Sequence, residues 1–228
     1  FPQAAPLVAG LLGADQAMCW DVSIACTGFV AGLAQGAALI ESGRAEHVLL
    51  VGADAISRHV DPTDRGPAAL FGDGAGAAVL TPGGAGRIGA TVMGSDGARG
   101  GFLIAHRADG IVRMDGQEVF RHAIARMAEC SLEALDREGL TVADLTLVVP
   151  HQANGRITAA LTERLALRPE QVVDDIADRG NTSAGTIPLA LHRAAAEGRL
   201  PARGHVLLTA FGAGFAWGAT VLHFGGAR

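Results

Sequence analysis

Val148-Val149-Pro150-His151-Gln152-Ala153-Asn154 is the segment from which the fold class follows most directly. It contains the end of a short, mostly apolar run, Leu145 to Val149, which is typical of a strand buried inside a sheet. Helical spacing begins at Asn154 and continues to Leu165. A polar residue between a buried strand and a helix lies where α/β folds place ligand-facing side chains. The segment therefore predicts an α/β fold with His151 facing a ligand site.

Strand-like and helix-like segments alternate on both sides of this segment, which indicates an α/β sandwich covered on both faces. Predicted strands span residues 17–22, 47–52, 76–80, 87–93, 145–149, 205–210 and 216–224. The strands at 17–22, 47–52 and 76–80 are expected to be buried. The strands at 205–210 and 216–224 are expected to be antiparallel neighbours. Predicted helices span residues 1–13, 25–42, 116–138, 154–165 and 182–198, of which 25–42 is apolar all round and should be buried. A turn near residues 82–86 suggests two similar halves, although no sequence repeat supports this.

Composition excludes several classes of function. The chain of 228 residues is 49% hydrophobic and 18% charged, as in a compact globular protein. Its net charge of −5, with no face dense in Lys or Arg, argues against nucleic acid. No stretch is long and apolar enough to span a bilayer, and we expect no membrane association. Three cysteines without a C-x-x-C pair predict neither disulfides nor a metal site, and suit the reducing cytoplasm.

Cys26 lies in Ser23-Ile24-Ala25-Cys26-Thr27-Gly28, at the predicted first turn of the buried helix. Free N–H groups at a helix N-terminus favour a thiolate over a thiol, so Cys26 is a candidate nucleophile. The alternative is a small buried apolar residue, which is the usual role of a free cysteine. That structural role is the expectation for Cys19, in a strand-like run, and for Cys130, inside a helix.

His151 and Asn181 occupy corresponding places, each just before a predicted helix. Asn181 begins the segment Asn181-Thr182-Ser183-Ala184-Gly185, after Gly180. Each is a weak signal alone, because a histidine is as often a structural hydrogen-bonding residue and Asn-Thr-Ser is a plausible N-cap. The same three residues match a glycosylation sequon, which we discount because nothing else indicates secretion.

Taken together, six segments resemble the β-ketoacyl-ACP synthase III family of the thiolase superfamily, in the family's order and approximate spacing. They are Ala25-Cys26-Thr27-Gly28-Phe29, Asp61-Pro62-Thr63-Asp64-Arg65-Gly66, Phe71-Gly72-Asp73-Gly74-Ala75-Gly76-Ala77, Pro150-His151-Gln152-Ala153-Asn154, Gly180-Asn181-Thr182-Ser183 and Phe211-Gly212-Ala213-Gly214-Phe215-Ala216-Trp217-Gly218. The resemblance implies a thiolase-like five-layer αβαβα fold of two similar halves. Residues 1–84 would form an incomplete N-terminal half with the nucleophile, and residues 85–228 a C-terminal half with the His and Asn.

The resemblance also implies a reaction of fatty acid biosynthesis. Cys26 would accept an acyl group from acyl-CoA, and malonyl-ACP would then condense with it, with loss of carbon dioxide, to give a 3-oxoacyl-ACP. His151 and Asn181 would stabilise the enolate on the malonyl thioester oxygen. The backbone N–H groups of Cys26 and Ala213 would form the oxyanion hole. No cofactor is implied beyond these thioester substrates, and the enzyme would be a homodimer.

Four further residues acquire roles only through the resemblance. Arg65 matches a residue that contacts the CoA adenine, and Phe71 one that lines the acyl pocket. Phe1 matches a phenylalanine that reaches across the dimer interface. Arg156 matches an arginine that docks the acidic carrier protein, the alternative being a solvated helix charge. The glycine-rich segment 71–78 lacks the Lys-Ser/Thr of a phosphate loop and is better interpreted as close packing beside the active site.

Two features depart from the family pattern. The family's N-terminal strands and helices have no counterpart, so we expect the sequence to be an incomplete record. Ala213 stands where the family commonly has Gly, which adds a methyl group near the oxyanion.

Two alternatives remain open. A specialised-metabolism homologue would be a polyketide starter enzyme, an alkylquinolone-type condensing enzyme or an acyltransferase. A catalytically silent partner subunit is disfavoured because such chains typically lose the nucleophile that Cys26 supplies.

Overall fold

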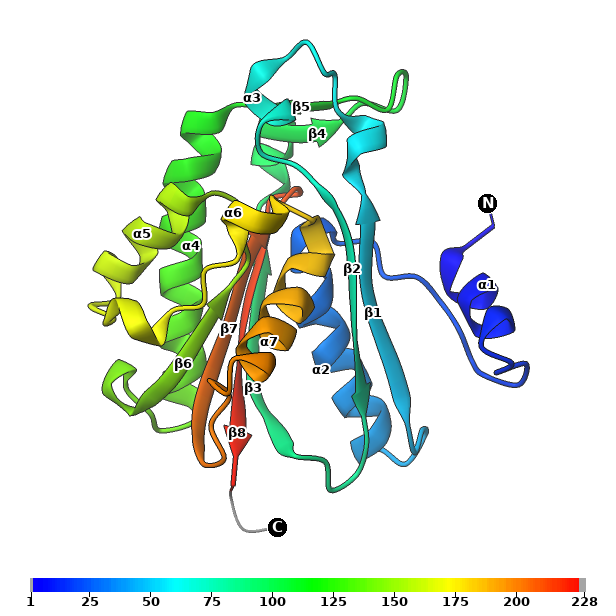
Figure 1. Ribbon diagram of the computed structural model, residues 1–228, viewed down its shortest axis with the longest axis vertical. Helices are drawn as coiled ribbons and strands as arrows, with labels where there is room; N and C mark the ends of the chain where they lie inside the picture. The colour runs from blue at the N-terminus through cyan, green and yellow to red at the C-terminus, as the bar shows by residue number, and fades with distance from the viewer. Residues whose placement is uncertain (1, 226–228) are drawn as a thin grey trace.

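The computed structural model describes residues 2–225 and alternates strands with helices (Figure 1). The strands are β1 (Val48–Ala55), β2 (Asp73–Leu80), β3 (Gly86–Ser95), β4 (Leu103–Ala105), β5 (Val112–Met114), β6 (Leu145–Pro150), β7 (Gly204–Gly212) and β8 (Ala216–Phe224). The α-helices are α1 (Ala4–Leu11), α2 (Gly28–Glu41), α3 (Arg65–Ala68), α4 (Gly116–Arg137), α5 (Gly155–Arg164), α6 (Ile176–Arg179) and α7 (Thr186–Ala196). Turns of 3₁₀ helix span Ala25–Thr27, Ile56–His59, Gly97–Phe102, Val142–Asp144, Pro169–Gln171 and Ser183–Gly185.

The strands form one large sheet and two small ones. The four-stranded sheet has the order β3-β8-β7-β6, with β6 parallel to β7 and the other pairs antiparallel. The predicted antiparallel pair near the C-terminus is confirmed, since β7 and β8 pair continuously from Gly204 opposite Phe224 to Gly212 opposite Ala216. β1 pairs with β2, and β4 with β5, both antiparallel.

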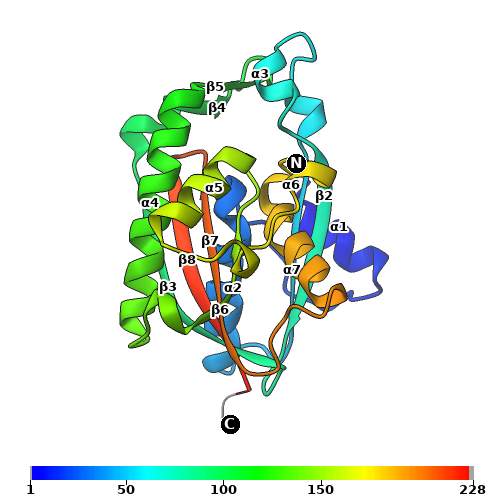
Figure 2. The same cartoon turned by 60° about the vertical axis from the view of Figure 1, so that its left-hand side comes forward.

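Helices separate and cover these sheets (Figures 1 and 2). α4 lies on one face of the four-stranded sheet, with α5 packed against it. α2 and α7 contact both the other face of that sheet and the β1–β2 pair. The described part of the chain therefore stacks a helix layer, a sheet, a second helix layer and a second sheet, which confirms the mixed α/β class.

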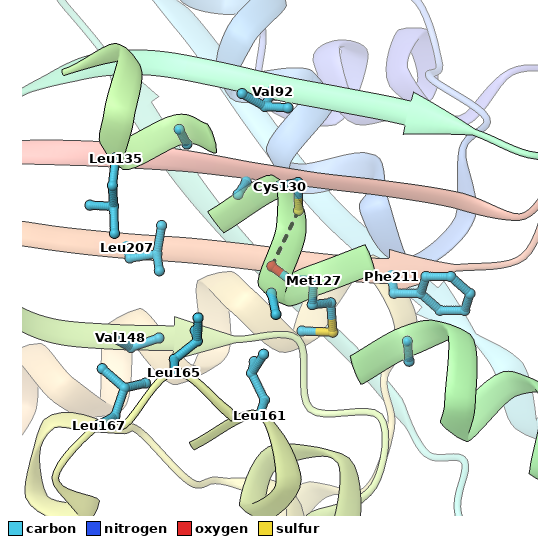
Figure 3. Packing of buried hydrophobic residues seen from close by; sticks show 14 of the residues in the cluster. Val92, Met127, Cys130, Leu135, Val148, Leu161, Leu165, Leu167, Leu207 and Phe211 are labelled. Carbon is cyan, nitrogen blue, oxygen red and sulfur yellow. Dashed lines mark hydrogen bonds between the residues drawn. The ribbon is translucent and has the colours of Figure 1, made fainter. Parts of the chain in front are cut away.

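The core under α4 joins that helix to the large sheet (Figure 3). Met127, Cys130 and Leu135 are almost fully buried against strand residues such as Val148 and Leu207. The Cys130 thiol donates to the Met127 carbonyl oxygen at 3.4 Å. The predicted structural role of Cys130 is thus confirmed.

Glycines let the β1–β2 pair approach its neighbours backbone to backbone. A Cβ added at Gly52 of β1 would lie 2.3 Å from the carbonyl oxygen of Ala184, and one at Gly76 of β2 2.8 Å from Pro188. No side chain fits at such distances. The glycine-rich segment 71–78, which includes Gly76, therefore serves close packing, as predicted, and Gly52 lets the turn Ser183–Gly185 lie directly against β1.

Three predictions about buried strands are wrong. Residues 76–80 do form the end of β2, but this strand is not buried, because it alternates half-buried with exposed residues and Val79 is 64% exposed. Residues 17–22 form no strand, and Met18 is 68% exposed, because no neighbouring strand lies beside this apolar run to pair with it. β1 is not enclosed in a parallel sheet. It pairs antiparallel with β2, which leaves Leu49 47% and Val51 42% exposed on its outer face.

The helix predicted for residues 25–42 begins as a 3₁₀ turn and continues as α2. Its first half is buried, through Phe29, Val30 and Leu33, while its last turn reaches solvent around Glu41. Its burial is thus confirmed only in part. The division into halves at residue 84 stays a prediction, although the strands of the β1–β2 pair precede that point in the chain and those of the four-stranded sheet follow it.

Candidate active site

Cys26 lies in the 3₁₀ turn that leads into α2. The preceding residue, Ala25, has φ +47°, a left-handed conformation that redirects the chain before the helix. The β7–β8 turn covers the cysteine, because a Cβ added at Gly212 would lie 2.9 Å from Cys26 Cβ and 3.3 Å from its sulfur. Cys26 is consequently buried, with 7% of its surface exposed.

Burial raises the pKa of the Cys26 thiol to about 11. The Ser183 hydroxyl, which donates to Cys26 Sγ at 3.5 Å, lowers the pKa, and the nearby Asp54 carboxylate raises it. Desolvation therefore acts against the stabilisation of a thiolate that the helix N-terminus is expected to provide.

His151 is held at the carboxyl end of β6, as the sequence predicts. Its backbone N–H donates to the Thr209 carbonyl oxygen of β7 at 2.8 Å, which continues the parallel pairing by one residue. The side chain is 1% exposed, and burial lowers its pKa to about 3. The imidazole is therefore neutral at physiological pH. Nδ1 lies 2.6 Å from Thr186 Oγ1, while Nε2 has no partner within the described residues.

Asn181 is fixed by backbone bonds to the N-terminal part of the chain. Its N–H donates to the Leu70 carbonyl oxygen at 2.7 Å, and its carbonyl oxygen accepts from Gly72 N–H at 3.0 Å. Its side-chain Oδ1 accepts from Ser183 N–H at 2.9 Å. Because Oδ1 accepts this bond, the amide NH₂ group is the part of the Asn181 side chain that is left to donate.

The turn Ser183–Gly185 connects the three candidate catalytic side chains. Ser183 orients Asn181 through its N–H and contacts Cys26 through its hydroxyl, in a left-handed conformation with φ +52°. Thr186, the first residue of α7, contacts His151. Nothing in the sequence singles out Thr186, and Ser183 is visible only as part of the Gly180-Asn181-Thr182-Ser183 motif.

A cavity of about 960 Å³ brings Cys26, His151 and Asn181 to one wall. Its other walls are mostly apolar and come from strands β4 and β5 and helix α4, through Leu103, Met114, Val119, Phe120, Ala123 and Met127. Asn154, Arg156, Arg113 and Gln117 add polar groups. The site thus combines a buried thiol, an imidazole, a side-chain amide and space for an apolar chain.

The other predicted residues divide into those that line this cavity and those that do not. Phe71 and Arg156 line it, and Arg156 is exposed. Arg65 is exposed at the start of α3, next to the lining residue Gly66, and Ala213 lies in the β7–β8 turn beside Gly212. Phe1 lies outside the described residues. Arg113, Gln117 and Phe120 are cavity residues that no sequence motif indicates.

Buried polar groups support the loop before Asn181. Gln152 donates from Nε2 to the carbonyl oxygens of Pro150 and Val173, and its Oε1 accepts from Asp175 N–H, at 2.9 to 3.1 Å. The Asp175 carboxylate, which is 3% exposed, accepts from Arg193 of α7 at 2.7 Å. These bonds join the end of β6 to α7 and hold the His151 and Asn181 segments in register.

Two searches over residues 2–225 give negative results. None of the helices there could cross a bilayer. No cluster of three or more His, Cys, Asp or Glu side chains in this range could hold a metal ion.

Comparisons with known proteins agree with this geometry. Residues 20–97 match the family model of 3-oxoacyl-[acyl-carrier-protein] synthase III, and residues 135–224 match its C-terminal model. The β-ketoacyl-[acyl-carrier-protein] synthase III 3 of Streptomyces coelicolor is 46% identical over 97% of this chain and 71% of its own length.

Solved structures give the same result. The 3-oxoacyl-[acyl-carrier-protein] synthase III of Aquifex aeolicus superposes with a TM-score of 0.95 at 42% identity, over 98% of this chain and 73% of that one. The priming β-ketosynthase of the R1128 polyketide pathway superposes with a TM-score of 0.92 at 39% identity, over 98% of this chain and 71% of that one.

The fold and the Cys-His-Asn site define a condensing enzyme of the thiolase-like fold. More narrowly, the chain belongs to the β-ketoacyl-[acyl-carrier-protein] synthase III family. It is therefore an acyltransferase of that type.

Proposed function

We propose that this enzyme catalyses the condensation that its family name describes, as a step of fatty acid biosynthesis. An acyl group passes from acyl-CoA to Cys26, and malonyl-ACP then condenses with it to give a 3-oxoacyl-ACP. The observation that carries the proposal is the single cavity that brings Cys26, His151 and Asn181 together beside an apolar wall.

In the first step the Cys26 sulfur attacks the thioester carbonyl of acyl-CoA. The bond from the carbonyl carbon to the CoA sulfur breaks, and the thiol proton of Cys26 is transferred to the departing CoA thiolate. The backbone N–H groups of Cys26 and Ala213 stabilise the tetrahedral oxyanion. The covalent intermediate divides the reaction into two half-reactions with ping-pong kinetics.

In the second step malonyl-ACP loses carbon dioxide, and its thioester becomes an enolate. The Asn181 amide and the His151 imidazole donate hydrogen bonds to the enolate oxygen, where negative charge develops. The enolate carbon attacks the acyl-Cys26 carbonyl and the carbon–sulfur bond breaks. The released Cys26 thiolate takes up a proton, which its raised pKa favours.

Substrate contacts extend this site to the rim of the cavity. Phe71 and the apolar residues of α4 line the space for the acyl chain. Phe1, by the family pattern, reaches across the dimer interface toward the pocket of the partner. Arg65 contacts the CoA adenine. The exposed Arg156 docks the acidic carrier protein at the cavity mouth.

The rest of the assignment rests on the family and on composition. No cofactor is needed beyond the two thioester substrates. We propose a homodimer, as in the family pattern that Phe1 matches. A cytoplasmic location suits three cysteines that the structure leaves free of disulfides.

A second candidate is the priming reaction of a polyketide pathway. It is favoured by the similarity to the R1128 priming β-ketosynthase, which is 39% identical to this chain. The chemistry at Cys26 would be the same, and the two candidates differ in the carrier protein and the primer.

Acylation assays test both candidates. The protein is incubated with a panel of acyl-CoA thioesters, and the adduct is mapped by peptide mass spectrometry with Cys26→Ala as control. Malonyl-ACP is then added and carbon dioxide release is measured. We expect acyl-Cys26 followed by carbon dioxide release, with the preferred primer and carrier separating the two pathways. Acylation of Cys26 without carbon dioxide release would contradict the condensation and indicate that the enzyme only transfers acyl groups.

A further inference from the structure

Thr186 offers one hydroxyl proton to two acceptors. Its Oγ1 lies 2.6 Å from His151 Nδ1 and 3.1 Å from the Ser183 carbonyl oxygen. Because the hydroxyl has a single hydrogen, it donates to only one of them. That choice decides which nitrogen of the neutral imidazole carries the proton.

The distances favour donation to His151. Hydroxyl donors make shorter hydrogen bonds than N–H donors, which have a usual separation of about 2.9 to 3.0 Å. The separation of 2.6 Å between Oγ1 and Nδ1 therefore suits an O–H donor. The separation of 3.1 Å from the Ser183 carbonyl oxygen is long for one.

We infer that Thr186 is a positioning residue that holds His151 in the tautomer protonated on Nε2. In this tautomer Nδ1 accepts from Thr186, and Nε2–H is a buried donor without a partner among the described residues. An Nε2–H group can donate to the enolate oxygen, whereas an Nε2 lone pair would repel it. The inference deepens the proposed function and rests on it for the role of that donor.

The opposite tautomer would assign His151 a different task. If Thr186 donated to Ser183, Nδ1–H would donate to Thr186, and the Nε2 lone pair would face the cavity as a base. The hydrogen bond of Thr186 thus decides whether His151 Nε2 is a donor or a base. The two tautomers give different ¹⁵N NMR signals for the ring nitrogens.

The test is ¹⁵N NMR of the histidine-labelled protein near neutral pH, with His151→Gln to assign the ring. We expect a protonated Nε2 and a hydrogen-bonded, unprotonated Nδ1 in the wild type. Thr186→Ser keeps the hydroxyl and should keep both signals. In Thr186→Val, which has nearly the same shape, the Nδ1 signal should move to that of an unbonded acceptor. A proton on Nδ1 in the wild type would overturn the inference.

The two half-reactions supply an independent readout. Removal of one such donor typically costs about 100- to 1,000-fold in rate, so Thr186→Val, which leaves the imidazole in place but no longer fixes its tautomer, should slow carbon dioxide release from malonyl-ACP by up to that extent. Transfer of the acyl group to Cys26 should change little, and Thr186→Ser should restore carbon dioxide release. Equal slowing of both half-reactions would reduce Thr186 to a structural role. Absence of carbon dioxide release from the wild type would instead contradict the proposed function, while the NMR result would still decide the tautomer.

Discussion

At Cys26, desolvation and a hydrogen bond act on the thiol in opposite directions. Burial raises the pKa to about 11, and the Ser183 hydroxyl opposes that rise. A resting thiol protects the nucleophile from oxidation and alkylation, since both reactions need the thiolate. The low thiolate population also makes the reactivity of this site strongly dependent on pH.

Alkylation of Cys26 by iodoacetamide should therefore accelerate about tenfold for each pH unit between about pH 6.5 and 9.5, without a plateau. The rate is measured from the Cys26 peptide by mass spectrometry. Ser183→Ala removes the bond that lowers the pKa and should slow labelling about two- to tenfold at a given pH. A plateau near neutral pH would mean that a preformed thiolate exists after all.

The roles of single residues could be predicted from the sequence to very different extents. His151 and Asn181 each lie just before a predicted helix, which is a weak signal for a ligand site, and their roles follow only from the six segments taken together. The raised pKa of Cys26 could not be predicted, because the β7–β8 turn that buries it lies far along the chain. Thr186 gives no local signal, since its importance depends on the distance to a ring from another segment.

Among the elements, the β1–β2 pair supports the site although it contributes no candidate catalytic residue. Strands β1 and β2 carry Gly52, Gly74 and Gly76 against the turn Ser183–Gly185 and helix α7. The glycine spacing of this pair is enough to predict close packing. The strand predicted for residues 17–22 shows the limit of such patterns, because strand formation requires a neighbouring strand to pair with.

Replacing Gly52 by Ala should move the turn that orients the catalytic side chains. The new methyl group would lie 2.3 Å from the Ala184 carbonyl oxygen, a backbone atom that cannot rotate away. Overpacking of this kind typically costs about 1 to 3 kcal/mol. We expect a lower free energy of unfolding in urea and slower acylation of Cys26.

Gly97→Ala is the matched control, because nothing lies within 4 Å of the position that its Cβ would take. It should change the free energy of unfolding by less than about 0.5 kcal/mol. If Gly52→Ala were equally harmless, the close contact between β1 and the turn would not constrain the site.

For the whole molecule, the buried neutral His151 links stability to pH. Its pKa is about 3 when folded, against 6.5 for an unperturbed histidine, so the unfolded state binds the proton more readily. The stabilising contribution is present above pH 6.5 and is lost as the pH falls toward 3. The enzyme should therefore lose stability in mild acid.

Urea unfolding at several pH values checks this expectation against His151→Gln, which cannot be protonated there. Above pH 6.5 the difference in free energy of unfolding between the two proteins should be constant. Below it, the wild type should lose up to about 1.4 kcal/mol per pH unit relative to the variant. If the free energies of unfolding of the two proteins fell in parallel as the pH is lowered, His151 would not contribute to the loss of stability in acid.

The glycines of β1 and β2 that leave no space for a Cβ atom also limit which substitutions the protein can tolerate. In a library of random substitutions selected for activity, Gly52, Gly74 and Gly76 should be nearly as intolerant as Cys26, although none of them touches a substrate. A survey of mutational tolerance would therefore mark a second group of essential positions. If every position that tolerates no substitution were taken as catalytic, these glycines would be assigned catalytic roles. Their contribution is only that they lack a side chain.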